Sequence, residues 1–369
     1  MKYSVNRKSV GVFGAAGLAL LLAASLTLTP VVTEADGLRQ ENTRPDWPMP
    51  NFNEHNTRNA PESTIDSSNV NTLGEVWAFE IPGMGNAYGG AASNPLIADG
   101  TVYFQDLGSN VFAIDLETGE VQWEHMFDTP VTGPNGPGLN QERVFVGIGQ
   151  DTVVALDRAT GEEVWRTVVD GPTGYSQLAA LDNTVYLGTG TRAYTPGVSG
   201  FIYALNADDG SVKWQFQTVE EGFWGAPEIN SGAGVWYPPA LDLERGVGYW
   251  GTGNPAPFAG IVGWPNGSSR PGPNLYANST LALDLEAGEL QWYDQPNPHD
   301  VFDLDFQSPR ILTTATVNGS ERTIVVASGK LGRVIANDVE TGEQLWDTEV
   351  GEHQNDDAAG VNPGETLTV

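Results

Sequence analysis

The sequence predicts an all-β protein, a beta-propeller built of four-stranded antiparallel blades, and two observations carry this prediction. The first is a motif of Ala, any residue, Asp or Asn, a turn containing Gly, and Trp. Its five copies run from Ala113, Ala155, Ala204, Ala282 and Ala336 to Trp123, Trp165, Trp214, Trp292 and Trp346. The second is spacing: counted from Trp77, these tryptophans lie 46, 42, 49, 78 and 54 residues apart. A period of about 40–50 residues is that of a propeller blade.

Each repeat contains the elements of a blade. An alternating apolar segment such as "TVYF", "RVFVG" or "TVYLG" precedes the motif and predicts a strand. The next strand, "VFAID", runs into a turn where Gly119 can adopt the left-handed conformation that closes a hairpin. Because a single blade cannot bury both of its faces, we expect each motif tryptophan to pack between neighbouring blades.

The longer intervals, 214–292 and 292–346, contain insertions, and insertions in propellers collect on one face, where function is sought. Counting from Trp77 gives five complete blades and part of a sixth, so about five to six blades are present. No helix-length amphipathic pattern or linker divides residues 36–369, which we interpret as one propeller domain. An open ring would expose apolar blade faces, so the sequence suggests a chain that is incomplete at its C-terminus or needs a partner.

Residues 1–35 have the pattern of a signal peptide. Lys2, Arg7 and Lys8 precede an apolar run over residues 10–28, and Ala35 offers a small residue for cleavage. An uncleaved membrane anchor is the alternative, because the run is nearly long enough to span a bilayer. Either reading predicts a periplasmic or extracellular protein with no integral membrane domain beyond this segment. The absence of cysteine excludes a disulfide framework, a lipoprotein attachment site and a covalent c-type haem motif.

The charge balance argues against two classes of partner. Asp and Glu number 47 against 17 Lys and Arg, which gives a formal net charge of −30. Such a field repels nucleic acid and anionic lipid. The acidic residues are spread along the chain, as in a solvated surface, and indicate nothing about a substrate.

Two segments contain oxygen ligands of the kind that hard cations prefer. In "YWGTGNPAPF", Pro255 ends a strand so that the Asn254 amide can project from it, although a simple turn asparagine is the alternative. In "PNPHDVFDLDF", Asp303 and Asp305 are two residues apart, which in an extended chain places both carboxylates on one side. Together they would suit a Ca²⁺-like ion rather than zinc, whereas solvated loop acids are the alternative.

Two further residues stand out from the repeat. Lys330 follows the strand "TIVVAS" and precedes a glycine turn, so it can project from a strand end, although most lysines face water. Trp236, in "GAGVWYPPALD", lies outside the blade motif and is a candidate stacking surface.

At these residues the chain resembles the pyrroloquinoline quinone (PQQ)-dependent alcohol dehydrogenases, quinoproteins built on an eight-bladed propeller. The resemblance covers the chain after the signal segment and is most specific between Trp236 and Lys330. It implies that Asn254 is an amide ligand to the metal and that Asp303 is the catalytic base beside that metal. It also implies that Trp236 is the stacking floor under the quinone, that Lys330 contacts a quinone oxygen, and that Asp305 is an additional ligand of lanthanide-using members.

The resemblance implies a dehydrogenase that oxidises an alcohol with PQQ and either Ca²⁺ or a lanthanide ion. In that reaction the metal polarises the quinone carbonyl, Asp303 removes the hydroxyl proton and hydride passes to the quinone. Electrons then leave to an external acceptor such as a cytochrome c. Asp300 is interpreted as part of the turn that presents the two carboxylates, and His299 is not interpreted as a metal ligand.

The sequence also departs from the family pattern. Thr195 stands nearest to the position where a glutamate ligand is expected, and Ala92 where an acidic cofactor contact is expected. The vicinal cysteine pair that covers the quinone is absent. These departures keep an alternative open, namely a non-catalytic propeller of the same repeat family that acts as an envelope assembly or interaction scaffold.

Overall fold

A computed structural model describes residues 46–81, 90–191 and 195–352. The predicted signal peptide lies outside these residues. Within them the structure contains β-strands and two short 3-10 helices, η1 (Val70–Thr72) and η2 (Phe223–Gly225), and no α-helix. In this part of the chain, no helix has the length and apolarity needed to cross a bilayer. The all-β prediction is therefore confirmed.

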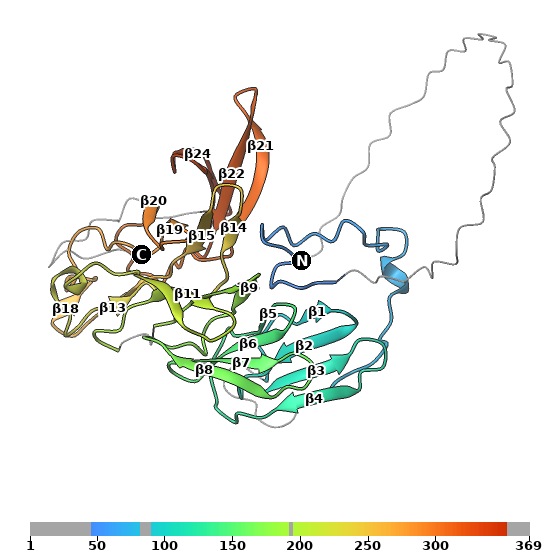
Figure 1. Cartoon of the computed structure of the whole chain (residues 1–369). Helices are drawn as coiled ribbons and strands as arrows, with labels where there is room; N and C mark the ends of the chain where they lie inside the picture. The colour runs from blue at the N-terminus through green and yellow to red at the C-terminus, as the bar shows by residue number, and fades with distance from the viewer. Residues whose placement is uncertain (1–45, 82–89, 192–194, 353–369) are drawn as a thin grey trace, which may run out of the picture. The chain divides into compact units, whose positions relative to one another are not determined.

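Five four-stranded antiparallel sheets follow one another along the chain (Figure 1). The first contains β1 (Leu96–Ala98), β2 (Thr101–Gln105), β3 (Val111–Asp115) and β4 (Val121–His125). The second contains β5 (Gly138–Leu139), β6 (Arg143–Ile148), β7 (Thr152–Asp157) and β8 (Glu163–Val168). The third contains β9 (Ala179–Leu181), β10 (Thr184–Gly188), β11 (Phe201–Asn206) and β12 (Val212–Gln217).

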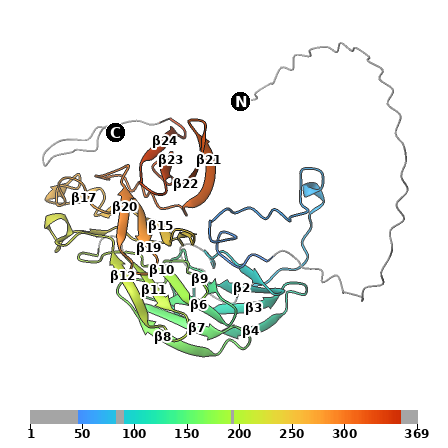
Figure 2. The same cartoon turned by 45° about the horizontal axis from the view of Figure 1, so that its top comes forward.

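The fourth and fifth sheets differ in having longer connections. The fourth contains β14 (Ala240–Asp242), β15 (Val247–Gly251), β19 (Thr280–Asp284) and β20 (Leu290–Asp294). The fifth, drawn as a separate sheet in Figure 2, contains β21 (Ile311–Val317), β22 (Ser320–Ser328), β23 (Arg333–Asp338) and β24 (Gln344–Glu349). Two small sheets lie in the connections: β13 (Ser231–Gly232) pairs with β16 (Pro255–Ala256), and β17 (Gly260–Ile261) pairs with β18 (Trp264–Pro265).

The repeat motif forms the hairpin between the third and fourth strands of every sheet. The register shifts by one residue after Ala113, Ala155, Ala204, Ala282 and Ala336, which places a β-bulge at the same point of each repeat. The turn glycines, of which Gly119 was singled out above, all have φ between 71° and 73°. The predicted left-handed turn is therefore confirmed in all five repeats.

Four of the five motif tryptophans join successive repeats, as predicted, whereas Trp346 of the fifth repeat is 38% exposed. The indole N–H of Trp123 donates to the carbonyl of Arg158 in the next repeat at 3.0 Å, and its ring lies against Gly161 of the same turn. The same indole-to-carbonyl bond joins Trp77 to Leu116, Trp165 to Ala207, Trp214 to Leu285 and Trp292 to Val339. Trp77 makes this contact from a segment that is not a strand. We call each of these five contacts a tryptophan dock.

The strands inside each sheet are buried more completely than their sequence alternation suggests. All five residues of β2 and four of the five residues of β3 are buried, whereas the outer strand β4 is largely exposed. Neighbouring sheets cover both faces of these inner strands, so alternation gives way to a continuous apolar run. Phe112 and Phe145, both fully buried, belong to the resulting core.

An N-terminal arm, residues 47–58, runs across strands of three sheets. Trp47 pairs with Ile97 of β1 through two backbone hydrogen bonds of 2.8 and 2.9 Å. The carbonyls of Glu54 and His55 accept hydrogen bonds from the first strands of the fourth and fifth sheets, β14 and β21. The arm thereby connects sheets that are far apart in the sequence.

Candidate functional site

The five residues singled out by the sequence lie at one end of the fourth and fifth sheets. In an antiparallel meander, successive connections alternate between the two ends of the sheet. The β15–β19 and β22–β23 connections therefore lie at the same end of their sheets as the segments that enter β14 and β21. Asn254 and Lys330 follow β15 and β22, Trp236 precedes β14, and Asp303 and Asp305 precede β21. We call this end of the sheets the site end, and it is where the long insertions lie.

A buried carboxylate holds the asparagine turn. Asp305 Oδ1 accepts a 2.8 Å hydrogen bond from the backbone N–H of Asn254, and the Asp305 side chain is only 2% exposed. Gly253 makes this approach possible, since a Cβ at that position would lie 2.7 Å from Asp305 Oδ1. The Asn254 amide nitrogen donates to the carbonyl of Pro255 at 3.0 Å. The turn is thus fixed against Asp305.

Lys330 brings a positive charge to both aspartates. Its Nζ donates to Asp303 Oδ2 at 3.0 Å and forms an ion pair with Asp305 Oδ2. Its backbone N–H donates to the Asp305 carbonyl at 2.8 Å. This close approach requires Gly329, where a Cβ would lie 2.3 Å from the Asp305 carbonyl oxygen. The strand end therefore delivers the ammonium to the carboxylates.

Trp236 lies beside this charged group. The Lys330 Nζ is 5.9 Å from the centroid of the Trp236 ring, within the range of a cation–π contact. The Trp236 carbonyl accepts a hydrogen bond from the backbone N–H of Gln177 in the segment that enters the third sheet. The indole is half-buried, so one part of its surface stays available to a ligand.

The loop around Asp303 has a different conformation from the one expected. Asp303 has φ of 64°, in the left-handed region, so the extended geometry assumed for residues 303–305 is wrong. Both carboxylates nonetheless reach Lys330. The reason is Asp300, whose two carboxylate oxygens accept hydrogen bonds from the N–H groups of Phe302 and Leu304 at 2.8 and 2.7 Å. The expectation that Asp300 belongs to the presenting turn agrees with these contacts.

Burial and neighbouring charges shift the pKa values of Asp305 and Lys330 in opposite directions. Burial raises the pKa of the Asp305 carboxyl, against the opposing effects of Lys330 and the Asn254 N–H. Burial alone would lower the pKa of Lys330, but its hydrogen bonds to Asp305 and Asp303 outweigh this, and its pKa is raised. The ammonium form of Lys330 is therefore stabilised. The Asp303 side chain, 40% exposed, remains accessible from solvent.

His299 and Arg270 have structural contacts. The ring nitrogens of the buried His299 face the carbonyls of Gly272 and Asn266 at 3.0 and 3.4 Å, away from the carboxylates. Arg270 is fully buried in the β15–β19 connection, and its guanidinium donates to the carbonyls of Phe258 and Asp300. Burial lowers the pKa of Arg270 to about 10. No repeat or motif in the sequence singled out Arg270, because its partners belong to irregular loops.

The donor set fits a hard cation in its chemistry. Asp303 and Asp305 supply carboxylate oxygens and Asn254 an amide oxygen, which are the ligands that Ca²⁺ and similar ions take. The Lys330 ammonium between the two carboxylates is evidence that this position favours positive charge. Among the described residues, no group of three or more His, Cys, Asp or Glu side chains could hold a metal. The set is therefore limited to two carboxylates and one amide.

The positions where the sequence departs from the family pattern have few contacts. Thr195 is half-buried, and its carbonyl accepts a 3.4 Å hydrogen bond from the backbone N–H of Val198. Ala92 is exposed in the segment that enters β1. Neither side chain supplies a carboxylate. Residues 192–194, in the same loop as Thr195, lie outside the described residues.

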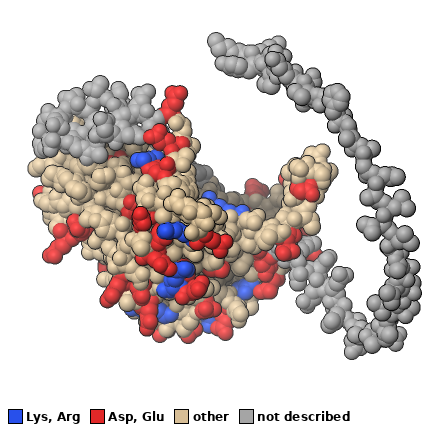
Figure 3. Space-filling model, turned by 90° about the horizontal axis from the view of Figure 1, so that it is seen from above, with Lys and Arg blue, Asp and Glu red and all other residues tan. Residues whose placement is uncertain are grey.

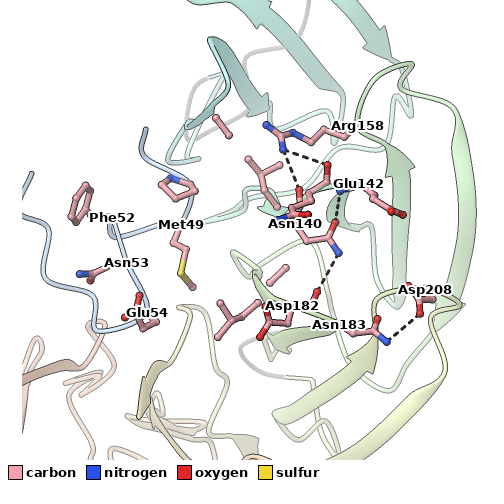
Figure 4. A pocket seen from close by; sticks show the side chains of 16 residues that line it. Met49, Phe52, Asn53, Glu54, Asn140, Glu142, Arg158, Asp182, Asn183 and Asp208 are labelled. Atoms are coloured by element: carbon pink, nitrogen blue, oxygen red, sulfur yellow. Dashed lines mark hydrogen bonds between the residues drawn. The ribbon is translucent and has the colours of Figure 1, made fainter. Parts of the chain in front are cut away.

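A cavity of about 710 Å³ lies at the opposite end of the sheets (Figure 4). The β5–β6 and β9–β10 turns and the N-terminal arm line it, and none of the predicted site residues does. Its polar groups bond one another: Asn140 donates to the Asp182 carbonyl, and Asn183 to Asp208 Oδ2 at 3.1 Å. Arg158 is paired with Asp99 at 2.8 Å. This cavity therefore offers no catalytic arrangement.

The surface charge agrees with the composition. Acidic side chains are dispersed over the face seen in Figure 3, with lysines and arginines scattered among them. On this face the acidic residues that contribute to the formal net charge of −30 are dispersed, and no basic patch is visible.

Comparison with known proteins identifies the family. The model of the PQQ-linked glucose/ethanol/alcohol dehydrogenase beta-propeller domain matches residues 47–135 and 176–367. The quinohemoprotein alcohol dehydrogenase of Comamonas testosteroni is 29% identical over 336 residues, which cover 81% of this chain and 46% of the relative. The quinoprotein alcohol dehydrogenase PedH of Pseudomonas putida is 33% identical over 280 residues, covering 67% of this chain and 46% of the relative.

Solved structures agree in fold. The crystal structure of the Comamonas testosteroni enzyme superposes with a TM-score of 0.71 at 27% identity, covering 83% of this chain and 49% of that chain. A europium-containing methanol dehydrogenase has a TM-score of 0.69 at 21% identity, covering 83% of this chain and 58% of that one, and shows likeness of fold alone. The chain spans about half the length of the curated relatives it matches. It belongs to the glucose/ethanol/alcohol dehydrogenase family of PQQ-type beta-propeller domains.

Proposed function

We propose that the protein is a PQQ-dependent dehydrogenase that oxidises an alcohol. One observation carries the proposal: Asp303, Asp305, Asn254, Lys330 and Trp236 meet at the site end of the fourth and fifth sheets. A carboxylate base, a hard-cation donor set, a fixed ammonium and an aromatic face are the groups that such a reaction uses. Membership of the family adds support.

Each residue has a separate task in this proposal. Asp303 is accessible and pairs with Lys330, so its carboxylate would take the proton from the substrate hydroxyl. Asn254 and Asp305 would hold the cation together with Asp303, and Trp236 would support the flat face of the cofactor. Bound PQQ would supply the electrophilic carbonyl that accepts hydride, with Ca²⁺ or a lanthanide ion as Lewis acid. Lys330 would hold a positive charge close to the negative charge that develops there.

We further propose that the protein acts in the periplasm or outside the cell and passes electrons to an external acceptor such as a cytochrome c. The signal pattern of residues 1–35 supports this placement, and the haem in the name of the quinohemoprotein relative supports electron transfer to a haem-containing acceptor. Dye-linked alcohol oxidation by the reconstituted chain tests the alcohol. The same assay with cytochrome c in place of the dye tests the acceptor.

The test is reconstitution of the full chain with PQQ and either Ca²⁺ or a lanthanide, followed by dye-linked oxidation of primary alcohols. We expect quinone absorbance to stay with the protein through gel filtration and turnover to depend on both PQQ and metal. Asp182→Asn, a left-handed aspartate at the opposite end of the sheets, is the control for the site variants. Loss of the quinone on gel filtration and no turnover with any metal would contradict the proposal and favour the non-catalytic scaffold.

A further inference from the structure

We propose that Asn278 is a positioning residue that holds the Asp303 loop and the Asn254 turn in register with each other. The inference rests on the proposed function, because it concerns the roles given there to Asp303 and Asn254. Asn278 lies at the end of the β15–β19 connection, and its hydrogen bonds go to Asp300, Phe306 and Gly253 rather than to either carboxylate of the candidate site. Its action is therefore indirect.

Three hydrogen bonds connect Asn278 to both segments. Its side-chain Nδ2 donates to Asp300 Oδ2 at 2.9 Å, and its Oδ1 accepts from the backbone N–H of Phe306 at 3.3 Å. These bonds fix the two ends of the loop that contains Asp303. Its own backbone N–H donates to the carbonyl of Gly253 at 2.9 Å, next to Asn254. Asn278, which is fully buried, thus contacts both the loop that contains Asp303 and the turn that contains Asn254.

Asp300 transmits this restraint to Asp303. The carboxylate that accepts from Asn278 also accepts from the N–H groups of Phe302 and Leu304, on either side of Asp303. Asp303 has φ of 64°, a conformation that costs a non-glycine residue free energy and persists only where the surroundings enforce it. The bond from Asn278 orients the Asp300 carboxylate, and this carboxylate in turn enforces the left-handed conformation of Asp303.

Arg270 supports Asp300 through its backbone rather than its carboxylate. It donates to the backbone carbonyl of Asp300 and to that of Phe258, both from its Nη2. Arg270 and Asn278 both lie in the β15–β19 connection, so this insertion holds the Asp303 loop together with Lys330, whose backbone N–H bonds the Asp305 carbonyl. The insertion therefore acts as a scaffold for the site.

The backbone of Asn278 makes a clean variant possible. Its φ of 49° is in the left-handed region, which glycine adopts without strain. Asn278→Gly therefore keeps the backbone bond to Gly253 and removes only the two side-chain bonds. Asn318 offers the matched control, because it has φ of 51° in the exposed β21–β22 turn and Asn318→Gly removes no contact with the site.

The experiment compares wild type, Asn278→Gly and Asn318→Gly by hydrogen exchange and by activity. We expect amide exchange in residues 300–306 to rise at least about tenfold in Asn278→Gly only. In the same variant, kcat with PQQ and metal should fall about 10- to 100-fold with KM for the alcohol nearly unchanged, because misplacement of the base affects the chemical step. Terbium binding, followed by tryptophan-sensitised luminescence without PQQ, should weaken roughly tenfold.

A charge test provides a second measurement that does not depend on glycine. Asn278→Asp keeps the size of the side chain and an acceptor for the Phe306 N–H, but places a carboxylate against that of Asp300. We expect kcat to fall further than in Asn278→Gly, because the Asp300 carboxylate is then repelled as well as released. A kcat close to that of wild type would contradict the role assigned to this hydrogen bond.

The outcomes separate this inference from the proposed function. Unchanged exchange in residues 300–306 of Asn278→Gly would overturn the inference, and so would faster exchange with unchanged kcat and terbium affinity. Wild-type protein that binds no PQQ or metal and has no turnover would instead contradict the proposed function. Exchange would then still decide whether Asn278 holds the loop.

Discussion

The tryptophan docks and the site end are built in different ways from the same sheets. At a dock, one indole N–H meets one carbonyl of the next repeat and one ring meets one left-handed glycine, five times with nearly the same geometry. At the site end, Asn254, Asp303 and Lys330 each come from a different irregular connection and occur once. Repetition therefore builds the contacts between sheets at the docks, whereas departure from the repeat brings together the polar groups of the proposed site.

The difference has a physical basis in what each region must satisfy. A dock buries an apolar ring and saturates its one polar atom, so nothing in it remains available to a ligand. The site end keeps Asp303 accessible and in a left-handed conformation, and collects two carboxylates beside one ammonium. Such an arrangement gains little stability by itself and depends on neighbouring loops. Substitutions in the two regions should therefore separate effects on activity from effects on folding.

The largest effect is expected at the site end. Asp303→Asn removes the carboxylate that we propose takes the proton, while keeping its size, so kcat should fall by about 100- to 10,000-fold. The melting temperature and much of the PQQ affinity should stay close to those of wild type, since the side chain is accessible. Steady-state kinetics of the reconstituted chain and a thermal melt test this. Activity within a fewfold of wild type would remove Asp303 as the base.

A change of similar free energy at a dock should affect folding instead. Trp214 is 7% exposed and bonds the Leu285 carbonyl, so Trp214→Ala should lower the free energy of unfolding by about 3–5 kcal/mol. Trp346 comes from the same motif position but is 38% exposed, and its alanine variant should cost less than about 1 kcal/mol. Urea unfolding followed by circular dichroism compares the two. Equal costs would contradict the assignment of stability to the docks.

The glycine side of a dock gives a smaller and more specific test. At Gly161, φ is 73° and a Cβ would lie 2.5 Å from the Trp123 ring, so Gly161→Ala combines backbone strain with a clash and should cost about 2–3 kcal/mol. Gly100 has the same φ with no atom within 4 Å of the added Cβ. Gly100→Ala should therefore cost only about 1 kcal/mol. Urea midpoints of the two variants would be indistinguishable if the dock contributed nothing.

At the site end, Asp305 should separate the two kinds of metal. Asp305→Ala removes a buried carboxylate beside the proposed cation, and a trivalent ion loses more attraction than a divalent one. We expect lanthanide-supported activity to fall about tenfold more than Ca²⁺-supported activity, or about 1.4 kcal/mol. Activity titrations with Ca²⁺ and with a lanthanide measure the ratio. Equal losses with both ions would argue against Asp305 as an additional lanthanide ligand.

The smallest effect concerns pH and the repeat turns. Backbone and side-chain hydrogen bonds from Thr118 lower the pKa of Asp115 below its usual value of 3.8. A carboxyl whose pKa is lower in the folded state than in the unfolded state stabilises the fold at pH values above its unfolded-state pKa. This contribution is lost as the pH falls through its folded-state pKa. The third repeat has Asn206 at this position, which does not titrate. Asp115→Asn should therefore slightly reduce the loss of stability between pH 5 and pH 3, measured by urea unfolding at each pH.

The repeated part of the molecule was largely predictable from the sequence. The spacing of Trp123 and its counterparts predicts the sheets, the hairpin glycines and the packing between repeats, because every copy satisfies the same local geometry. The sequence of the inner strands predicts alternating burial, whereas their continuous burial depends on neighbouring sheets that a single segment does not reveal.

The site was predictable in its members but not in its geometry. Resemblance to a family singles out Asn254, Asp303 and Lys330, yet the left-handed conformation of Asp303 arises from the Asp300 carboxylate. Asn278 carries no sequence signal, because its partners come together only through the paths of two long connections. Contacts between irregular segments leave no period in a sequence.

The N-terminal arm imposes an order on folding. Its Asn56 bonds the Arg310 carbonyl across 254 residues of sequence, and the arm is made by the ribosome long before the fifth sheet. Local hairpins close early, whereas a contact of such separation must await the chain that it joins. We therefore expect Trp47 to pair with β1 early and the contacts of His55 and Asn56 to form only when β21 is present, so protection of this part of the arm from protease would report the completion of the fifth sheet.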